Sequence, residues 1–545
     1  MSQADPAPRA SLAGSTAVMA VGTFASRLLG FVRAATLTSA IGVATASADA
    51  FDVANRIPDF FYAVLAGGVL NAILVPQIVR AYARDDGERF VGKLLTIGVT
   101  VIAAVTALLT ASAALLIALY TRGWTAEQKA LAVAFAVWCI PQLFFYGLYT
   151  LLGQLLNARG SFGPYMWAPV VNNVIQIAGF GVFIVMYGRN HEVGTWQPGQ
   201  VGLLAGTTAL GVAAQALILL VPLRRIGFRF RPSWSLRDSG LGSAARVALW
   251  TLGALLVDQV AVWMAYKLAS GAPEAAGGTG PGNAVLTYAL AIYVIPHSLV
   301  TVSLTTALFT RMSEAASLGD VDGVRSDLSF GMRTTSAFTL FATAALIVLA
   351  LPLARLLFPA TEFWQVQAVA EALVPLSLGL VPLGMTLLIK RVFFAFEDGR
   401  TVFAFQIPMA VVFMGVSLVA VRILPPTWWV VGICLAQTLS YVAGVVLRLQ
   451  SLRARLGGID GRRLASMHAR AGLAAIVSGE MGWMALRLVP GAGQSVGWSA
   501  VALAGIGCLM AALYLTLLWV LRVRELSQFL APLLARVPGR RGGAA

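Results

Sequence analysis

Charged side chains are scarce in this chain. Only 11% of its 545 residues are Asp, Glu, Lys or Arg, whereas soluble domains carry roughly 25%. Hydrophobic residues make up 58% of the chain, and the mean hydropathy is +0.80. So little charge cannot cover a surface that faces water. The composition therefore excludes a soluble globular protein and predicts that the bilayer is the solvent of this chain.

Residues that bind metals or form disulfides are also few. The chain has three cysteines and three histidines, and none of them has the spacing of a zinc site or of a disulfide framework. We find no nucleophile beside a base and no glycine-rich phosphate loop. The sequence therefore predicts no metal site, no bound cofactor and no enzymatic activity.

Long apolar runs, by contrast, are abundant. A helix that spans a bilayer needs about 20 mostly apolar residues. Runs of that kind lie near residues 15–43, 58–82, 93–120, 129–157, 164–187, 200–223, 242–269, 284–312, 330–351, 366–396, 401–421, 428–449, 466–488 and 497–522. The sequence thus predicts an all-α integral membrane protein with about fourteen transmembrane helices.

The basic residues follow an alternating pattern between these runs. If both termini are cytoplasmic, 29 of the 39 Lys and Arg residues fall on the cytoplasmic side and 8 on the opposite side. Membrane proteins accumulate Lys and Arg in their cytoplasmic loops. The pattern therefore predicts a multi-pass protein with cytoplasmic tails at 1–14 and 523–545, and it explains the net charge of +16 without nucleic acid as a partner.

Prolines and glycines recur at similar offsets in the two halves of the chain. Offsets of 238, 241 and 239 residues relate Pro58 to Pro296, Pro141 to Pro382, and Gly160 to Gly399. The offsets favour two six-helix lobes related as parallel repeats, as in many transporters. The lobes are predicted at 15–223 and 242–449, with a basic cytoplasmic linker at 224–241 and two accessory helices in 450–522. The alternative is that Pro and Gly are simply common in membrane helices.

Two arginines lie inside the first apolar run. An arginine at the centre of a membrane helix costs about 2.5–3.5 kcal/mol, so Arg27 and Arg33 call for an aqueous cavity or an anionic partner. Six residues of helix separate them by about 9 Å and about 120°, so they can share one cavity wall with Ser26. Guanidinium groups bind phosphate in bidentate fashion. The alternative is that both side chains extend to the interface.

Acidic residues cluster after the first run. Asp49, Asp52, Arg56 and Asp59 form a candidate outer gate closed by ion pairs, or else a solvated loop. Asp258 is a lone carboxylate in an apolar run, and such residues favour cation or proton coupling or an arginine partner. Further polar residues within apolar runs are Asn71, Gln77, Asn172 and Asn173.

Several motifs resemble those of one known family. The segments "SRLLGFVRA", "ADAFDVANRIPD" and "GGVLNAILVPQIV", in this order, together with "WAPVVNN" and "FFAFEDGRT", resemble the MurJ/MviN family of lipid II flippases. That family belongs to the multidrug/oligosaccharidyl-lipid/polysaccharide exporter superfamily. The resemblance implies head-group binding by Ser26, Arg27 and Arg33. Arg56 would replace an arginine that relatives carry where this chain has Tyr62.

The resemblance also implies roles for other parts of the chain. Asp49 would be a gate residue, with Asp52 beside it. The helices within 450–522 would form a groove for a polyprenyl tail. Asp258 and Asp398 would be the candidate ion-coupling residues, although a side-chain amide partner of the family's sodium site is replaced near Phe394.

The resulting hypothesis is a flippase of the bacterial cell membrane. It would move lipid II, the undecaprenyl-diphosphate-linked peptidoglycan precursor, from the inner to the outer leaflet by alternating access. The membrane potential or an ion gradient would drive it, and membrane lipids and the cell-wall synthesis machinery would be its partners. The alternatives are a cation-coupled multidrug antiporter, a flippase for another polyprenyl-linked saccharide, and a scaffold that transports nothing.

Overall fold

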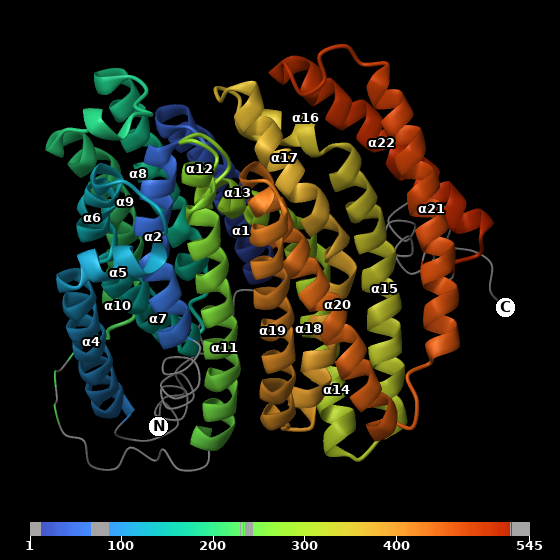
Figure 1. Ribbon diagram of the computed structural model, residues 1–545. Coiled ribbons are helices and arrows are strands. Elements are labelled where there is room, and N and C mark those ends of the chain that lie inside the picture. Colours follow the sequence, from blue (N-terminus) through green and yellow to red (C-terminus); the bar gives the residue numbers. More distant parts are fainter. Residues whose placement is uncertain are drawn as a thin grey trace. The chain divides into compact units, whose positions relative to one another are not determined.

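The computed structural model of the chain describes residues 12–66, 87–228, 230, 232, 234, 244–523 and 525. These residues form helices and their connections, with no β-strand among them (Figure 1). The predicted all-α class is therefore confirmed. The chain divides into two compact units, Met1–Ala284 and Val285–Ala545, and each is described by itself.

In the first unit, α8 packs against α1 on one side and against α9 on the other, and α6 packs against α2 and α9. An apolar core of Leu and Ile side chains from α4 and α7 lies between these two helices. The elements are α1 (Leu12–Ile41), α2 (Ala46–Leu65), α4 (Gly87–Ala111), α5 (Ala113–Tyr120), α6 (Ala126–Cys139), α7 (Gln142–Ala158), α8 (Gly163–Tyr187), the 3-10 turn Val193–Thr195, α9 (Pro198–Leu217), α10 (Leu220–Arg225), α11 (Ala244–Ser270) and α12 (Ala272–Ala275).

In the second unit, α15 packs against α18 and α21, and α21 packs in turn against α22 (Figure 1). The elements are α13 (Asn283–Pro296), the π-helical turn His297–Thr301, α14 (Val302–Ser317), α15 (Val321–Val348), α16 (Ala350–Leu357), α17 (Phe363–Leu378), α18 (Leu380–Ala395), α19 (Gly399–Ile423), the 3-10 turn Pro426–Trp428, α20 (Trp429–Arg455), α21 (Gly461–Arg487) and α22 (Val496–Val520). The first two residues of α13 fall in the first unit.

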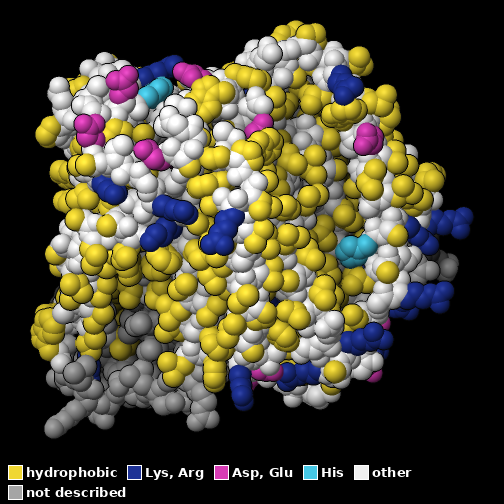
Figure 2. All heavy atoms as spheres, viewed as in Figure 1, with side chains coloured by type: hydrophobic (Ala, Val, Ile, Leu, Met, Phe, Trp, Pro, Cys, Tyr) yellow, Lys and Arg dark blue, Asp and Glu magenta, His cyan; other side chains and the backbone are white. Residues whose placement is uncertain are grey.

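The helices have the length and composition of membrane spans. Among the described residues, ten helices are long and apolar enough to cross a bilayer, and the pair α17–α18, bent by 49°, forms an eleventh. Hydrophobic side chains cover most of the visible face of both units, and Lys and Arg gather at the lower ends of the helices in the second unit (Figure 2). The predicted count of about fourteen is compatible with this finding but not confirmed by it.

Some predicted segments lie outside the described residues. They include most of the two tails, most of the linker 224–241, and Asn71 and Gln77. The lobe boundaries at 15–223 and 242–449 stay a prediction. The division into compact units falls after Ala284, so that α11 belongs to the first unit.

Prolines mark breaks within several helices. Pro141 separates α6 from α7, Pro296 ends α13 just before the π-helical turn, and Pro382 lies in the first turn of α18. Proline has no backbone N–H and clashes with the preceding turn, which explains why helices break at these places. Pro58, in contrast, lies inside α2.

The bend between α17 and α18 depends on a close contact. A Cβ atom on Gly379 would lie 2.6 Å from Thr438 Oγ1 and 3.0 Å from the Tyr293 hydroxyl. The Thr438 hydroxyl donates to the carbonyl of Pro375 at 2.7 Å, which satisfies an acceptor next to the break. A glycine is therefore required where α20 crosses the bend.

We predict that Gly379→Ala destabilises the protein by about 1–3 kcal/mol, because the added methyl group overpacks this contact. Gly415→Ala is the control, since nothing lies within 4 Å of the Cβ position there, and Ala is a better helix former than Gly by up to about 1 kcal/mol. Thermal unfolding of the purified protein in detergent measures both changes. Equal melting temperatures for the two variants would contradict the prediction.

Candidate functional site

The first helix is attached to α8 next to its arginines. Asn173 of α8 donates from Nδ2 to the Ser26 carbonyl at 2.9 Å and reaches the Ser26 hydroxyl at 3.5 Å. Two polar residues that the sequence suggested separately are thus bonded to each other. Arg27, the next residue along α1, is exposed.

Arg33 faces a different environment from Arg27. Its side chain is half-buried, and its charge acts on the carboxylate of Asp59 in α2 and on the hydroxyl of Tyr146 in α7. The deeper arginine therefore already has an anionic neighbour on another helix. An anionic ligand that binds Arg33 has to compete with Asp59.

Arg56 is held between charged and aromatic groups. Its guanidinium carbon lies 3.8 Å from the ring centroid of Tyr266 in α11, and its Nε lies 3.7 Å from Asp52 Oδ2. Its charge also acts on Asp59. Arg33, Arg56, Asp52 and Asp59 thus form one electrostatic cluster of two cations and two anions.

Asp49 lies where α2 begins and is fully buried. Its Oδ1 accepts a hydrogen bond from the backbone N–H of Ala284 at 2.8 Å, so the carboxylate caps the start of α13. Within the described residues its Oδ2 has no hydrogen-bond partner. Asp49 therefore links α2 to the first turn of α13. The gate role of Asp49 and Asp52 stays a prediction.

The two candidate ion-coupling residues have different surroundings. Asp258 is exposed on α11 in the first unit, and the neighbouring Gln259 donates from Nε2 to the Phe60 carbonyl at 3.3 Å. Asp398 lies in the second unit and is the N-cap of α19. Their coupling role stays a prediction.

Both carboxylate oxygens of Asp398 are engaged. Oδ1 accepts from the Thr401 amide at 3.0 Å, and Oδ2 accepts from the Thr401 hydroxyl at 2.8 Å and from Arg455 at 2.7 Å. Desolvation acts to raise the pKa of Asp398, but these hydrogen bonds and the Arg455 charge outweigh it, so that the pKa lies below its usual value. A cation at this carboxylate would have to displace Arg455.

Sequence reasoning missed several partners in the site. Tyr266 contacts Arg56, but in the sequence most of the first unit lies between them. Tyr146 lies on a third helix. Aromatic residues are common in membrane helices, so neither has a sequence signal that distinguishes it. A group of arginines in the second unit was also missed, because the positive-inside pattern already accounted for each of them.

The chain is similar to proteins of one family. The family described as "Lipid II flippase MurJ" matches residues 37–495. A "Probable lipid II flippase MurJ" from Vibrio cholerae is 26% identical over 520 residues, which cover 92% of this chain and 94% of the relative. One from Rhizobium meliloti is 29% identical over 425 residues, which cover 75% and 74%.

Two solved structures share the fold. "Lipid II flippase MurJ, inward closed conformation" matches with a TM-score of 0.69 at 19% identity and covers 95% of this chain and all of that chain. An inward-facing multidrug resistance MATE family transporter of the MOP superfamily matches with a TM-score of 0.64 at 17% identity and covers 82% and 99%. At these identities the likeness shows the fold alone.

We predict that Gly282→Ala displaces the Asp49 carboxylate and destabilises the protein by about 1–3 kcal/mol. A Cβ atom at Gly282 would collide with both carboxylate oxygens, whereas Gly181, the control position, has open space. Thermal unfolding of Gly282→Ala is compared in the wild-type and the Asp49→Ala backgrounds. The loss should largely disappear without the carboxylate, and an equal loss in both backgrounds would show that the contact is unimportant.

For Asp398 we predict a loss of roughly 1 kcal/mol in Asp398→Ala, because α19 loses its N-cap. Because the pKa of Asp398 is lowered, the charged carboxylate stabilises the fold fully at pH values above 3.8, the ordinary pKa of the group. This contribution is lost as the pH falls through the lowered pKa. The melting-temperature difference between wild type and Asp398→Asn should therefore narrow in acid. A stabilisation by NaCl over KCl that only the wild type shows would instead indicate a sodium ligand.

Proposed function

The chain belongs to the MurJ family of lipid II flippases, and from this premise we propose that it moves lipid II from the inner to the outer leaflet of the bacterial cell membrane. The family match over residues 37–495 carries the proposal. The chain is a transporter of the MurJ type, with a membrane as its solvent and a lipid-linked saccharide as its substrate.

The arginines of α1 suit the diphosphate of this substrate. A guanidinium group forms paired hydrogen bonds with phosphate oxygens and keeps its charge when buried. Arg27 is exposed and Arg33 half-buried, and Ser26 lies beside them. We propose that the diphosphate binds Arg27 first. It then takes the place of the Asp59 carboxylate next to Arg33, while the charge of Arg56 holds the released carboxylate.

This exchange of partners gives substrate binding a way to move helices. Asp59 lies on α2 together with Asp49, which caps the start of α13. A substrate that releases Arg33 from Asp59 therefore alters the forces on α2, and α2 carries the predicted gate. We propose that alternating access proceeds in this way, since only interactions that differ between two states can shift their populations.

The direction of transport follows from the charge of the head group. A membrane potential that is negative inside favours outward movement of an anion by about 2.3 kcal/mol per charge per 100 mV. With both termini cytoplasmic, as the distribution of Lys and Arg predicts, the head group enters from the basic side. An ion gradient acting through Asp258 or Asp398 is the alternative driving force.

An apolar groove in the second unit suits the polyprenyl tail. It has a volume of about 340 Å³ and lies where α18, α20 and the first turns of α21 meet. Its lining includes Val381, Met385, Val442, Val446 and Leu464. Mostly apolar walls, with His468 as the ionisable side chain in the lining, match a hydrocarbon chain, and this supports the role proposed for the accessory helix α21.

We predict that Arg33→Ala lowers flipping of lipid II by roughly tenfold or more, because a hydrogen bond to a charged group contributes about 1.5–3 kcal/mol. The assay uses cells depleted of their own flippase, an external enzyme that cleaves only outward-facing lipid II, and matched amounts of protein in the membrane. Arg422→Ala is the control, since this exposed arginine lies outside the cluster.

A double variant separates substrate binding from structure. If Arg33 served only to neutralise Asp59, Arg33→Ala/Asp59→Ala would restore flipping. If Arg33 binds the diphosphate, the double variant stays inactive. Full flipping by Arg33→Ala would exclude the binding role, and no flipping by the wild type would point to another polyprenyl-linked substrate or to an antiporter.

A further inference from the structure

A basic pocket forms in the second unit. It has a volume of about 630 Å³ and lies between α15, α21 and the end of α22. Its charged and hydroxyl lining consists of Arg333, Arg462, Arg463, Ser466, Arg470, Arg522 and Glu525. Five arginines against one glutamate leave a surplus of four positive charges. We call this the arginine pocket.

Helix geometry and a strained turn assemble the pocket. Arg463 and Arg470 are seven residues apart on α21, and such a spacing places both on one face of a helix. At the end of α22, Arg522 has a φ of 54°, a left-handed conformation that favours glycine. This turn, in which the Val523 amide donates to the Leu518 carbonyl at 2.9 Å, leads the chain back to the pocket at Glu525.

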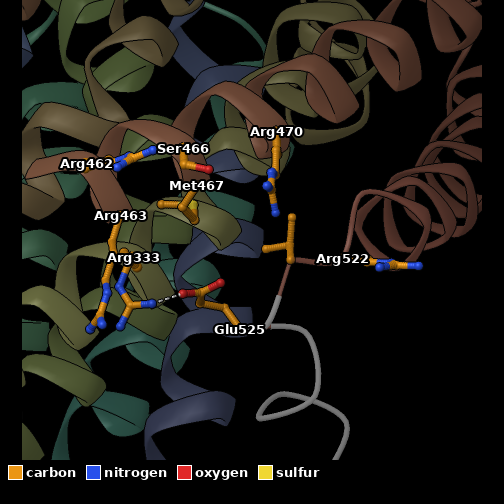
Figure 3. A pocket seen from close by; sticks show the side chains of 9 residues that line it. Arg333, Arg462, Arg463, Ser466, Met467, Arg470, Arg522 and Glu525 are labelled. Carbon is orange, nitrogen blue, oxygen red and sulfur yellow. Dashed lines mark hydrogen bonds and ion pairs between the residues drawn. The ribbon is translucent and has the colours of Figure 1, made fainter.

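Two of the arginines have partners within the protein. Arg333 donates from Nε to the Ser329 carbonyl at 3.2 Å and forms an ion pair with Glu525. Arg470 donates to the Leu521 carbonyl at 3.3 Å. Figure 3 shows Glu525 facing Arg333, and Arg463 lines the same pocket.

The other arginines have no such neighbours. In the part of the chain that the structure describes, neither Arg462 nor Arg463 has a hydrogen-bond or ion-pair partner. Residues 526–545 contain three arginines and no aspartate or glutamate. A surplus of positive charge in a pocket attracts anions.

The surroundings of the pocket indicate what kind of anion. The next turns of α21 and the last turns of α22 present exposed apolar side chains, among them Leu473, Ile476, Trp519 and Val520. Trp519 is 73% exposed, and exposed Trp is typical of the membrane interface. A ligand that fits both features has a phosphate for the arginines and acyl chains for the apolar faces.

We propose that the arginine pocket binds the head group of an anionic phospholipid of the inner leaflet, with Arg462 and Arg463 on its phosphate. Basic pockets between membrane helices on the cytoplasmic side bind head groups of this kind. A soluble phosphate has the same charge but makes no use of the apolar faces. The bound lipid joins α15, α21 and α22 at one point and stabilises the accessory helices, because a ligand that binds only the folded state raises its stability.

The test uses the full chain purified in detergent and titrated with phosphatidylglycerol or with phosphatidylcholine. Native mass spectrometry counts the lipids that stay bound, and thermal unfolding measures the stabilisation. The variant is Arg462→Gln/Arg463→Gln. The control is Arg400→Gln/Arg453→Gln, which removes two exposed arginines outside the pocket and changes the net charge equally.

We expect tight binding of phosphatidylglycerol by the wild type and the control, and roughly 30-fold weaker binding by the pocket variant, because each basic residue near an anionic lipid contributes about 1 kcal/mol. Phosphatidylcholine should bind weakly to all three. The single variant Arg470→Gln should also weaken the binding of phosphatidylglycerol. It keeps the test decisive if the double variant fails to fold.

Three outcomes would overturn the proposal. Equal losses in the pocket variant and the control would mean that the lipid binds by general charge attraction. Stabilisation by inorganic phosphate or pyrophosphate that matches that by phosphatidylglycerol would identify a site for a soluble anion. Displacement of phosphatidylglycerol by lipid II at equal concentration would make the pocket part of the transport site.

Discussion

The hydrocarbon core of a bilayer contains no water to solvate polar groups, and both the charged cluster of the first unit and the helix breaks of the second are shaped by that constraint. Backbone groups are satisfied within helices. A charged side chain in the core needs a partner of opposite charge or a cavity. Arg33 and Arg56 meet this need with Asp59 and Asp52 on a neighbouring turn or helix. The two positive and two negative charges balance within the first unit.

The same constraint governs the helix breaks. At the bend between α17 and α18, the Gly379 amide turns to the Leu376 carbonyl at 2.8 Å, and a side chain of another helix donates to the Pro375 carbonyl instead. The Thr438 hydroxyl donates to the carbonyl of Pro375, and a glycine at 379 allows α20 to approach closely enough. Broken helices supported in this way are typical of transporters, because a break is a place where a helix can bend during alternating access.

Two groups of arginines differ in how their charge is balanced. The group in the first unit, formed by Arg33, Arg56, Asp52 and Asp59, has two positive and two negative charges. The arginine pocket in the second unit has a surplus of four positive charges and only one acidic residue. The first arrangement suits a ligand that is bound and released in each cycle. The second suits the lipid proposed for the arginine pocket.

The sequence by itself determined the class of protein and the position of the first arginines. Composition predicts a membrane protein because apolar residues outnumber charged ones along nearly the whole chain, and the spacing of Arg27 and Arg33 follows from helix geometry alone. The order of the motifs pointed to the MurJ family, and the match over residues 37–495 confirms it. The clustering of Asp49, Asp52, Arg56 and Asp59 was also visible, because these residues are close together in the sequence.

Only the tertiary structure decided which partner each residue has. Asp49 caps a backbone amide 235 positions away, and Asn173 bonds to Ser26 across 147 positions. Asp398, a predicted ion-coupling residue, proved to be the N-cap of α19 and the partner of Arg455. The arginine pocket combines three helices whose basic residues look alike in the sequence. Local patterns determine what a segment becomes, whereas contacts between distant segments depend on how whole helices pack.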